Sequence, residues 1–170
     1  MFVETARLEI REWTSDDFEA FAVLMADPEV MRFSLKGGPL SIEEAREYFQ
    51  KRILDHYKNG FGLWALVYKE EQQFIGLAGL ITQEIDGEKK IELAYRLLPK
   101  YWHRGLALEA TRAVCTYAFT GLKLKELISI IEPDNVRSIR LAERLAMRPL
   151  KMTKFHHKKV YIYAKSSESR

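Results

Sequence analysis

The sequence predicts a mixed α/β (α+β) fold, in which one sheet carries helices on both faces. Three observations predict it. Apolar residues recur at every second position in some segments and at helical spacing in others, and these segments follow one another in the order β-α-α-β-β-β-α-β-α-β-β. The segments 61–68 and 74–81 are apolar at most positions, which is typical of strands covered on both sides. With 170 residues, 47% of them hydrophobic, the chain can bury one core without disulfide bonds or a structural metal. We therefore expect a single domain over 1–165 and a polar, frayed tail at 166–170.

The first part of the chain predicts one strand and two helices. Polar and apolar residues alternate over 7–11, as in a half-buried strand. A helix-start signal at 14–17 opens a first helix, which ends at 27–28. A serine and a glutamate at 41–44 form a capping signal for a second long helix, which runs to 59–60.

The middle of the chain predicts three strands and a helix. The two apolar segments, 61–68 and 74–81, form an antiparallel hairpin, and 91–98 is the next strand. A long helix follows over 104–120, and 127–131 is a short strand.

The last part predicts one helix and two strands. The helix starts at the cap residues 134–135 and is closed by Pro149. Its inner face comprises Val136, Ile139, Ala142 and Leu145. The segments 150–155 and 158–164 are predicted as the final strands.

Composition and charge exclude several classes of protein. The formal charge is +3, and the basic residues are spread out except at 151–159, so a dedicated nucleic-acid binder is not predicted. No window approaches the roughly 20 apolar residues of a membrane span, and Glu4 lies where a signal peptide needs a basic start. The lone Cys115 is interpreted as a small core residue. We expect a cytoplasmic protein, a monomer or homodimer, without a metal site.

The most informative stretch is 97–110, where a strand runs through a short loop straight into a helix. The first amides of a helix have no intrahelical partner and carry partial positive charge, so such a junction favours anions. Gly105 lets a phosphate approach the backbone, and the small Ala107 keeps the first turn open. The stretch is neither a P-loop nor a dinucleotide fingerprint. Taken alone, a glycine at a helix start also fits an ordinary tight turn.

Four blocks of sequence, the loop among them, follow one another in order. They are 5–11 (TARLEIR) with Asp16-Asp17, 91–99 (IELAYRLLP), 101–110 (YWHRGLALEA) and 135–145 (NVRSIRLAERL). With them the chain resembles the GNAT acetyltransferases, specifically the branch of ribosomal-protein N-terminal (RimJ/RimL-like) enzymes. The resemblance implies a GNAT fold, with a mixed, mostly antiparallel sheet that splays between 91–98 and 127–131. It also implies acetyl-CoA as the acyl donor.

The resemblance assigns site residues as well. The loop would hold the coenzyme A diphosphate through the main-chain amides of His103, Arg104, Gly105, Leu106, Ala107 and Leu108. Tyr95 to Leu97 would lie at the splay, and the Leu97 amide would donate to the acetyl carbonyl as an oxyanion donor. Asn135 and Ser138 match an Asn-x-x-Ser pattern that contacts the pantetheine arm and the sulfur region.

Five positions depart from the family pattern. Ala142 lies where several relatives carry a tyrosine that protonates the leaving thiolate, which makes Ser138 the nearest candidate acid. Trp102 and His103 replace the more frequent Gln/Arg and Gly of the loop. The pair at 146–147 is Ala-Met, where Gly-Phe is usual after the last helix.

The candidate base is Glu92, because an acid in an apolar strand beside the acyl site could have a raised pKa and act through water. A solvated or salt-bridged structural role for Glu92 is equally open. The histidines His56, His156 and His157 are expected at the surface.

Two further groups each have two interpretations. Arg137, Arg140, Arg144 and Arg148 recur at helical steps. They form either a solvated face or, through Arg140 and its neighbours, a site for the 3′-phosphate of the coenzyme. Phe33, Phe61 and Trp64 either line an acceptor pocket or belong to the core.

The sequence therefore predicts an N-acetyltransferase that passes an acetyl group from acetyl-CoA to a primary amine by direct attack. The amine is a protein N-terminus, an amino acid or another small molecule. The alternative is a catalytically weak acyl-CoA-binding sensor or partner module. The lysines within 151–159 would disfavour a polycation such as spermidine near that edge.

Overall fold

The computed structural model describes residues 3–35, 37–54 and 60–167. Its strands are β1 (Val3–Glu4), β2 (Leu8–Arg11), β3 (Leu63–Tyr68), β4 (Gln73–Ile85), β5 (Glu88–Leu97), β6 (Glu126–Ile131), β7 (Arg148–Phe155) and β8 (Lys158–Ser166). Its helices are α1 (Phe18–Ala26), α2 (Pro28–Met31), α3 (Ile42–Tyr48), α4 (Leu106–Thr116) and α5 (Val136–Arg144). Single helical turns are η1 (Ser15–Asp17), η2 (Phe49–Leu54), η4 (Pro99–Tyr101) and η5 (Tyr117–Gly121).

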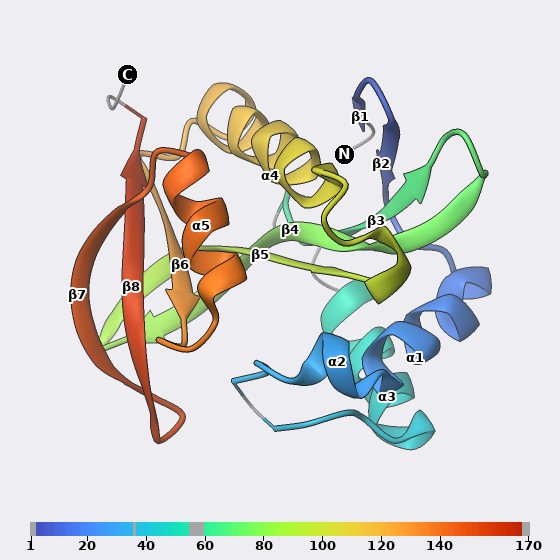
Figure 1. Ribbon diagram of the computed structural model, residues 1–170, viewed down its shortest axis with the longest axis horizontal. Helices are drawn as coiled ribbons and strands as arrows, with labels where there is room; N and C mark the ends of the chain where they lie inside the picture. The colour runs from blue at the N-terminus through green and yellow to red at the C-terminus, as the bar shows by residue number, and fades with distance from the viewer. Residues whose placement is uncertain (1–2, 36, 55–59, 168–170) are drawn as a thin grey trace.

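The described strands form one sheet in the order β1-β2-β3-β4-β5-β6-β8-β7. Neighbours are antiparallel except β5 and β6, which pair in parallel. Within the described residues, that parallel contact has one register pair, Glu92 with Ile128. Beyond it the two strands diverge, and Figure 1 shows β6 leaving the direction of β5. This confirms the predicted mixed, mostly antiparallel sheet that splays between these two strands.

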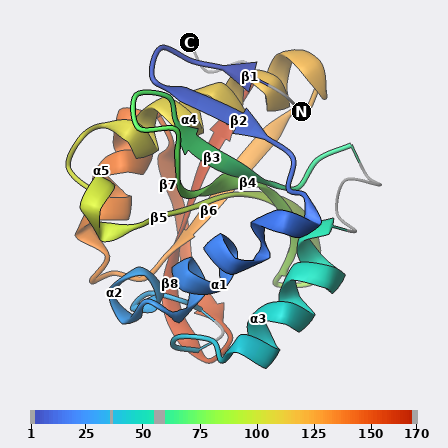
Figure 2. The same cartoon turned by 90° about the vertical axis from the view of Figure 1, so that its right-hand side faces the viewer.

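Helices cover both faces of the sheet, as predicted. Figure 2 shows α4 on one side of β3 and β4, and α1 and α3 on the other. On the α4 side, Leu80, Ala110 and Val114 belong to one core, to which α5 contributes Ala142. On the other side, the Trp13 ring packs edge-on against the rings of Phe21 and Phe49, and Leu63 and Leu77 belong to the same core. The two apolar strands of the sequence are therefore covered on both faces.

The N-terminal helices are more broken than the sequence predicts. The first helix does end at Asp27, but the Asp27 carboxylate accepts hydrogen bonds from the amides of Glu29 and Val30 and so caps a second, short helix, α2. The capping box at Ser41 and Glu44 starts α3 as predicted. Regular α-helix stops at Tyr48 and continues as a π-helical turn, and the rest of the predicted helix lies outside the described residues.

The last helix also ends earlier than predicted. It stops at Arg144 because Ala146 has a left-handed φ of 58° and the Met147 amide bonds to the Ala142 carbonyl. Pro149 belongs to β7 and does not close the helix. On the predicted inner face, Ala142 and Leu145 are buried, whereas Val136 is half exposed.

Strand β8 extends two residues beyond its predicted end at 164. Strand β8 continues to Ser166, and the Ser167 amide donates to the Lys125 carbonyl at 2.9 Å. Residues 168–170 lie outside the described part of the chain. Among the helices of the described residues, none has both the length and the apolar run that crossing a bilayer requires.

Candidate active site

A cavity of about 770 Å³ opens where β5 and β6 part. One end is lined by the loop and first turn of α4, including His103, Gly105 and Ala107. The middle is lined by β5, β6 and α5. The other end is lined by side chains around α2 and α3, among them Phe33 and Tyr48. The cavity is thus a continuous channel between the predicted anion loop and the helices on the opposite face.

At the first end, the backbone of the loop presents free amides. The first intrahelical bond of α4 runs from the Glu109 amide to the Gly105 carbonyl at 3.1 Å. The amides of Gly105, Leu106, Ala107 and Leu108 therefore have no acceptor within the helix. Gly105 has a left-handed φ of 76°, and no side chain caps the helix. His103 also has a left-handed φ, 59°, which gives a physical reason why glycine is frequent there in the family pattern.

In the middle, the β5 edge facing β6 offers further backbone groups. Leu97 pairs with Gly76 of β4, and a Cβ on Gly76 would overlap the Arg96 carbonyl oxygen. The Arg96 carbonyl thus faces β4. The N–H and C=O of a trans peptide point in opposite directions, so the Leu97 amide points away from β4, into the splay. By the same alternation, Tyr95 turns its main-chain groups toward the splay.

The Leu97 segment is fixed on both sides. Trp102 Nε1 donates to the Leu97 carbonyl at 2.7 Å, and the Leu98 amide donates to the Ile75 carbonyl at 2.8 Å. At the apex of the splay, Ser129 Oγ of β6 donates to the Leu93 carbonyl at 3.2 Å. The amide predicted as oxyanion donor is therefore held in place before any ligand arrives.

A pair of hydroxyl groups bridges the cavity. Tyr95 Oη of β5 lies 2.9 Å from Ser138 Oγ of α5, and both residues line the cavity. Burial raises the pKa of the Tyr95 hydroxyl above its ordinary value, so it stays protonated at neutral pH. Asn135 accepts a hydrogen bond from the Ser138 amide at 3.2 Å as the cap of α5, which fixes the serine. Sequence reasoning singled out Tyr95 and Ser138 separately but not their contact.

The predicted base lies deeper. Glu92 is buried, lines the cavity and accepts a hydrogen bond from Gln83 Nε2 of β4 at 2.7 Å. Glu92 and Leu97 are five positions apart on the same strand, about 16 Å at the usual rise. The carboxylate can therefore reach a group held at the Leu97 amide only through intervening water.

Basic side chains line the outer part of the cavity. Arg137, Arg140 and Arg144 of α5 are exposed and contribute to its lining, whereas Arg148 lies on β7. The Arg137 guanidinium lies 3.9 Å from the centre of the Trp102 ring and so links α5 to the loop. The face is solvated, and three members of the row border the cavity; a 3′-phosphate site there stays a prediction.

Several predicted residues lie elsewhere. The Arg104 side chain turns away to Tyr68, donating to its hydroxyl at 3.1 Å, and Arg104 does not line the cavity. Of the three aromatic candidates, Phe33 lines the cavity, whereas Phe61 and Trp64 pack in the α4-side core. His156 and His157 are exposed at the turn between β7 and β8, and His56 lies outside the described residues.

Two buried residues lack the chemical group that a catalytic role would need. Cys115 lies in the core, where burial raises the pKa of its thiol to about 11 and so disfavours the thiolate. Ala142, which lines the cavity and is buried, offers no proton at the place of the family tyrosine.

The comparisons with known proteins agree with this geometry. The model for the acetyltransferase (GNAT) domain matches residues 7–148. The chain belongs to the GNAT acetyltransferase family. An uncharacterized N-acetyltransferase, YnaD, of Bacillus subtilis is 27% identical over 148 residues, covering 87% of this chain and 83% of YnaD. The family match makes this chain an acetyltransferase, and acetyl-CoA-dependent N-acetylation is the general reaction of the family.

Solved structures share the fold along the whole chain. A GNAT acetyltransferase from Bacillus anthracis superposes with a TM-score of 0.83 at 27% identity, over 99% of this chain and 100% of that one. A spermidine N-acetyltransferase from Vibrio cholerae, in complex with CoA and spermine, gives 0.78 at 18% identity, over 96% and 97%. A ribosomal-protein-S5-alanine acetyltransferase from Vibrio fischeri gives 0.81 at 15%, over 99% and 97%. The cofactor of this GNAT chain is acetyl-CoA.

Proposed function

We propose that this GNAT acetyltransferase transfers the acetyl group to a primary amine by direct attack, without a covalent enzyme intermediate. The acceptor is a protein N-terminus, an amino acid or another small amine, and the setting is the cytoplasm. One observation carries the proposal. A single cavity joins the free amides of α4 to the Leu97 amide and then to the space beside α2 and α3. That channel suits a long thioester entering from one side and an amine from the other.

The backbone supplies the binding groups for the donor. The amides of Gly105 to Leu108 would hold the diphosphate, and Arg140 with its neighbours on α5 would meet the 3′-phosphate. The exposed edge at Tyr95 would pair with the pantetheine amides as an added strand does. The Leu97 amide would donate to the thioester oxygen, which becomes negative as the amine nitrogen attacks the carbonyl carbon.

Two protons must move in this reaction. The attacking amine loses one, and Glu92 would receive it through water, since the strand separates it from Leu97 by about 16 Å. The sulfur gains the other as the C–S bond breaks. Ser138 would deliver that proton as it takes one from the Tyr95 hydroxyl, which lies 2.9 Å away, and Tyr95 would regain its proton from water in the cavity before the next turnover. This hydroxyl pair would replace the tyrosine that several relatives carry at the position of Ala142.

Ala142, at the place of a proton-donating tyrosine, also favours a second candidate function. A chain that binds acyl-CoA without an efficient thiolate acid would act as a sensor or partner module. The two functions differ in stoichiometry, because an enzyme releases one coenzyme A for each acetylated amine, whereas a sensor only binds.

The deciding experiment measures thiol release from acetyl-CoA while amines and N-terminal peptides are added one at a time, with products identified by mass spectrometry. We expect turnover with at least one amine, and poor turnover with spermidine because of the lysines near 151–159. Binding of acetyl-CoA with no turnover across the panel would favour the sensor. Saturable spermidine acetylation would overturn the expectation about polycations.

Glu92→Gln tests the base. Loss of the carboxylate should lower kcat about 100-fold while the affinity for coenzyme A stays unchanged, since general-base catalysis contributes on that order. An unchanged kcat would restrict Glu92 to its structural contact with Gln83.

A further inference from the structure

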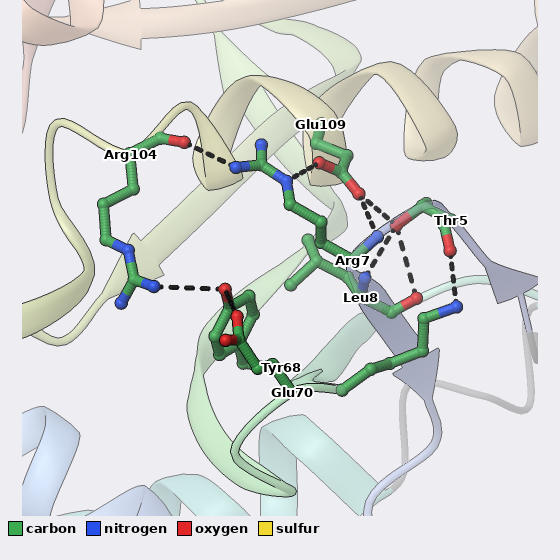
Figure 3. Close-up of polar contacts among 8 residues, drawn as sticks. Thr5, Arg7, Leu8, Tyr68, Glu70, Arg104 and Glu109 are labelled. Atoms are coloured by element: carbon green, nitrogen blue, oxygen red, sulfur yellow. Dashed lines mark hydrogen bonds and ion pairs between the residues drawn. The ribbon is translucent and has the colours of Figure 1, made fainter.

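The N-terminal block 5–11 has no role in the mechanism above, yet it contacts the anion loop directly. Figure 3 shows Thr5 and Arg7, in the turn between β1 and β2, reaching the first turn of α4. Arg7 Nε donates to Glu109 Oε2 at 2.7 Å, and the Arg7 amide donates to Glu109 Oε1 at 2.8 Å. Thr5 Oγ1 donates to the same Oε1 at 2.6 Å.

The same arginine also holds the loop itself. Arg7 Nη1 donates to the Arg104 carbonyl at 2.9 Å. That carbonyl and the Gly105 amide belong to one peptide, in which C=O and N–H point in opposite directions. Drawing the carbonyl toward Arg7 therefore turns the Gly105 amide away from Arg7, toward the cavity that Gly105 lines. The side chain of Arg104 is anchored separately, over the Tyr68 ring.

Charge supports the same arrangement. Glu109 is in the first turn of α4, where an unpaired carboxylate would repel an approaching diphosphate. Burial alone would raise the pKa of Glu109, but hydrogen bonds from Thr5 and Arg7 lower it below its ordinary value, so the carboxylate is ionised and engaged. The Arg7 guanidinium offsets its charge.

We propose that Thr5 and Arg7 are positioning residues for the coenzyme diphosphate, acting by aiming the Gly105 amide and by neutralising Glu109. This inference rests on the proposed function, because it assumes that the loop binds coenzyme A. An ordered loop loses less conformational entropy on binding, so the contribution should appear in the affinity for the coenzyme and not in the chemical step.

The test uses Arg7→Met, with Arg11→Met as a matched control. Arg11 is an arginine of the same block whose ion pair, to Asp17 at 2.7 Å, lies away from the loop. Binding of coenzyme A is measured by calorimetry. Steady-state rates are measured with acetyl-CoA and with S-acetylpantetheine, which has the same thioester but no diphosphate. We expect Arg7→Met to raise the Kd for coenzyme A about tenfold, to leave kcat unchanged, and to leave kcat/KM for S-acetylpantetheine unchanged.

Two results would overturn the proposal. One is a Kd for Arg7→Met equal to that of Arg11→Met. The other is an equal loss with both thioesters, which indicates a general structural role. If Arg7→Met does not fold, Arg7→Lys decides in its place, because a lysine can pair with Glu109 but lacks the second arm for the Arg104 carbonyl. Failure of the unmodified protein to bind coenzyme A would instead contradict the proposed function.

Discussion

The two ends of the cavity are built differently. At the coenzyme end, the groups that face the cavity are largely main-chain amides, at Leu97 and from Gly105 to Leu108, held by a glycine, a helix start and a strand edge. At the acceptor end, the lining is made of side chains from α2 and the segment after it, α3 and the strands, such as Phe33 and Tyr48. A backbone site depends on where a few glycines and caps fall, whereas a side-chain site can change with each substitution. This difference explains why the donor is readable from the sequence and the acceptor is not.

The largest expected effect comes from a side chain added to the backbone site. Gly105→Glu places a carboxylate where the diphosphate binds, and we expect loss of measurable coenzyme A affinity. Gly105→Ala should cost far less. Its Cβ would meet only Arg7 Nη2 at 3.5 Å, so the penalty is the left-handed φ, about 1–2 kcal/mol. Calorimetric titration of both variants measures this. If the Gly105→Glu variant and the native protein had equal affinity for coenzyme A, the coenzyme end would not be a backbone site at Gly105.

Two glycines of β4, Gly76 and Gly79, provide a test of the β5 edge at Leu97. A Cβ on Gly76 would overlap the Arg96 carbonyl, and a Cβ on Gly79 would overlap the Gly62 carbonyl. We expect either Gly→Ala change to destabilise the fold by about 2–4 kcal/mol, measured by denaturant unfolding. Only Gly76→Ala should also lower kcat in the protein that remains folded, because it displaces β5 beside Leu97. Equal kcat values in the two variants would argue against the Leu97 amide as oxyanion donor.

The hydroxyl pair of Tyr95 and Ser138 tests the proposed proton source. Ser138→Ala should lower kcat about 100-fold and Tyr95→Phe about tenfold, with little change in the KM for acetyl-CoA. Because burial raises the pKa of Tyr95, the hydroxyl remains a proton donor across the neutral range. The loss in Tyr95→Phe should therefore be the same at pH 7 and pH 9. A kcat unaffected by both substitutions would exclude the pair as the proton source.

At the acceptor end, Phe33→Ala should act on the amine alone. The half-buried ring lines the cavity beside α2, and its removal should raise the KM for a good amine several-fold, on the order of 1–2 kcal/mol of lost apolar contact. The Kd for coenzyme A should stay unchanged. A parallel rise in both constants would show that the two ends are not separate.

The smallest effect concerns the end of α5. Ala146 has a left-handed φ of 58° at a position that favours glycine, so Ala146→Gly should stabilise the protein by about 1 kcal/mol. Thermal unfolding measures this, and kcat should not change. Destabilisation would contradict the account of why the helix stops there.

Much of the fold could be predicted from local patterns. Strands β3 and β4 were evident because their apolar runs are covered on both faces, and the caps of α3 and α5 because capping uses a few short-range residue types. The early end of α5 was not evident, since it depends on a left-handed alanine and not on a glycine. The short helix α2 was missed because Asp27-Pro28, a stop signal for α1, is also a start signal.

The site divides in the same way. The loop is suggested by its place between a strand and a helix, but the glycine alone also fits a tight turn, and the Leu97 amide was assigned only by the resemblance to the family. Three contacts could not be predicted. Arg7 and Glu109 are 102 residues apart and Tyr95 and Ser138 are 43 apart, and no local pattern relates them. Gln83 and Glu92 meet across the β4–β5 hairpin, whose register the sequence does not specify. Such long-range pairs arise from the topology of the sheet.

The central claim is that main-chain amides at Leu97 and at the start of α4 hold the thioester donor. Its most direct test is an NMR titration of isotope-labelled protein with coenzyme A and then acetyl-CoA. We predict that coenzyme A shifts the amide resonances of Gly105 to Leu108, and that acetyl-CoA additionally shifts the Leu97 resonance. Saturable binding that leaves all five amide resonances unchanged would contradict the account.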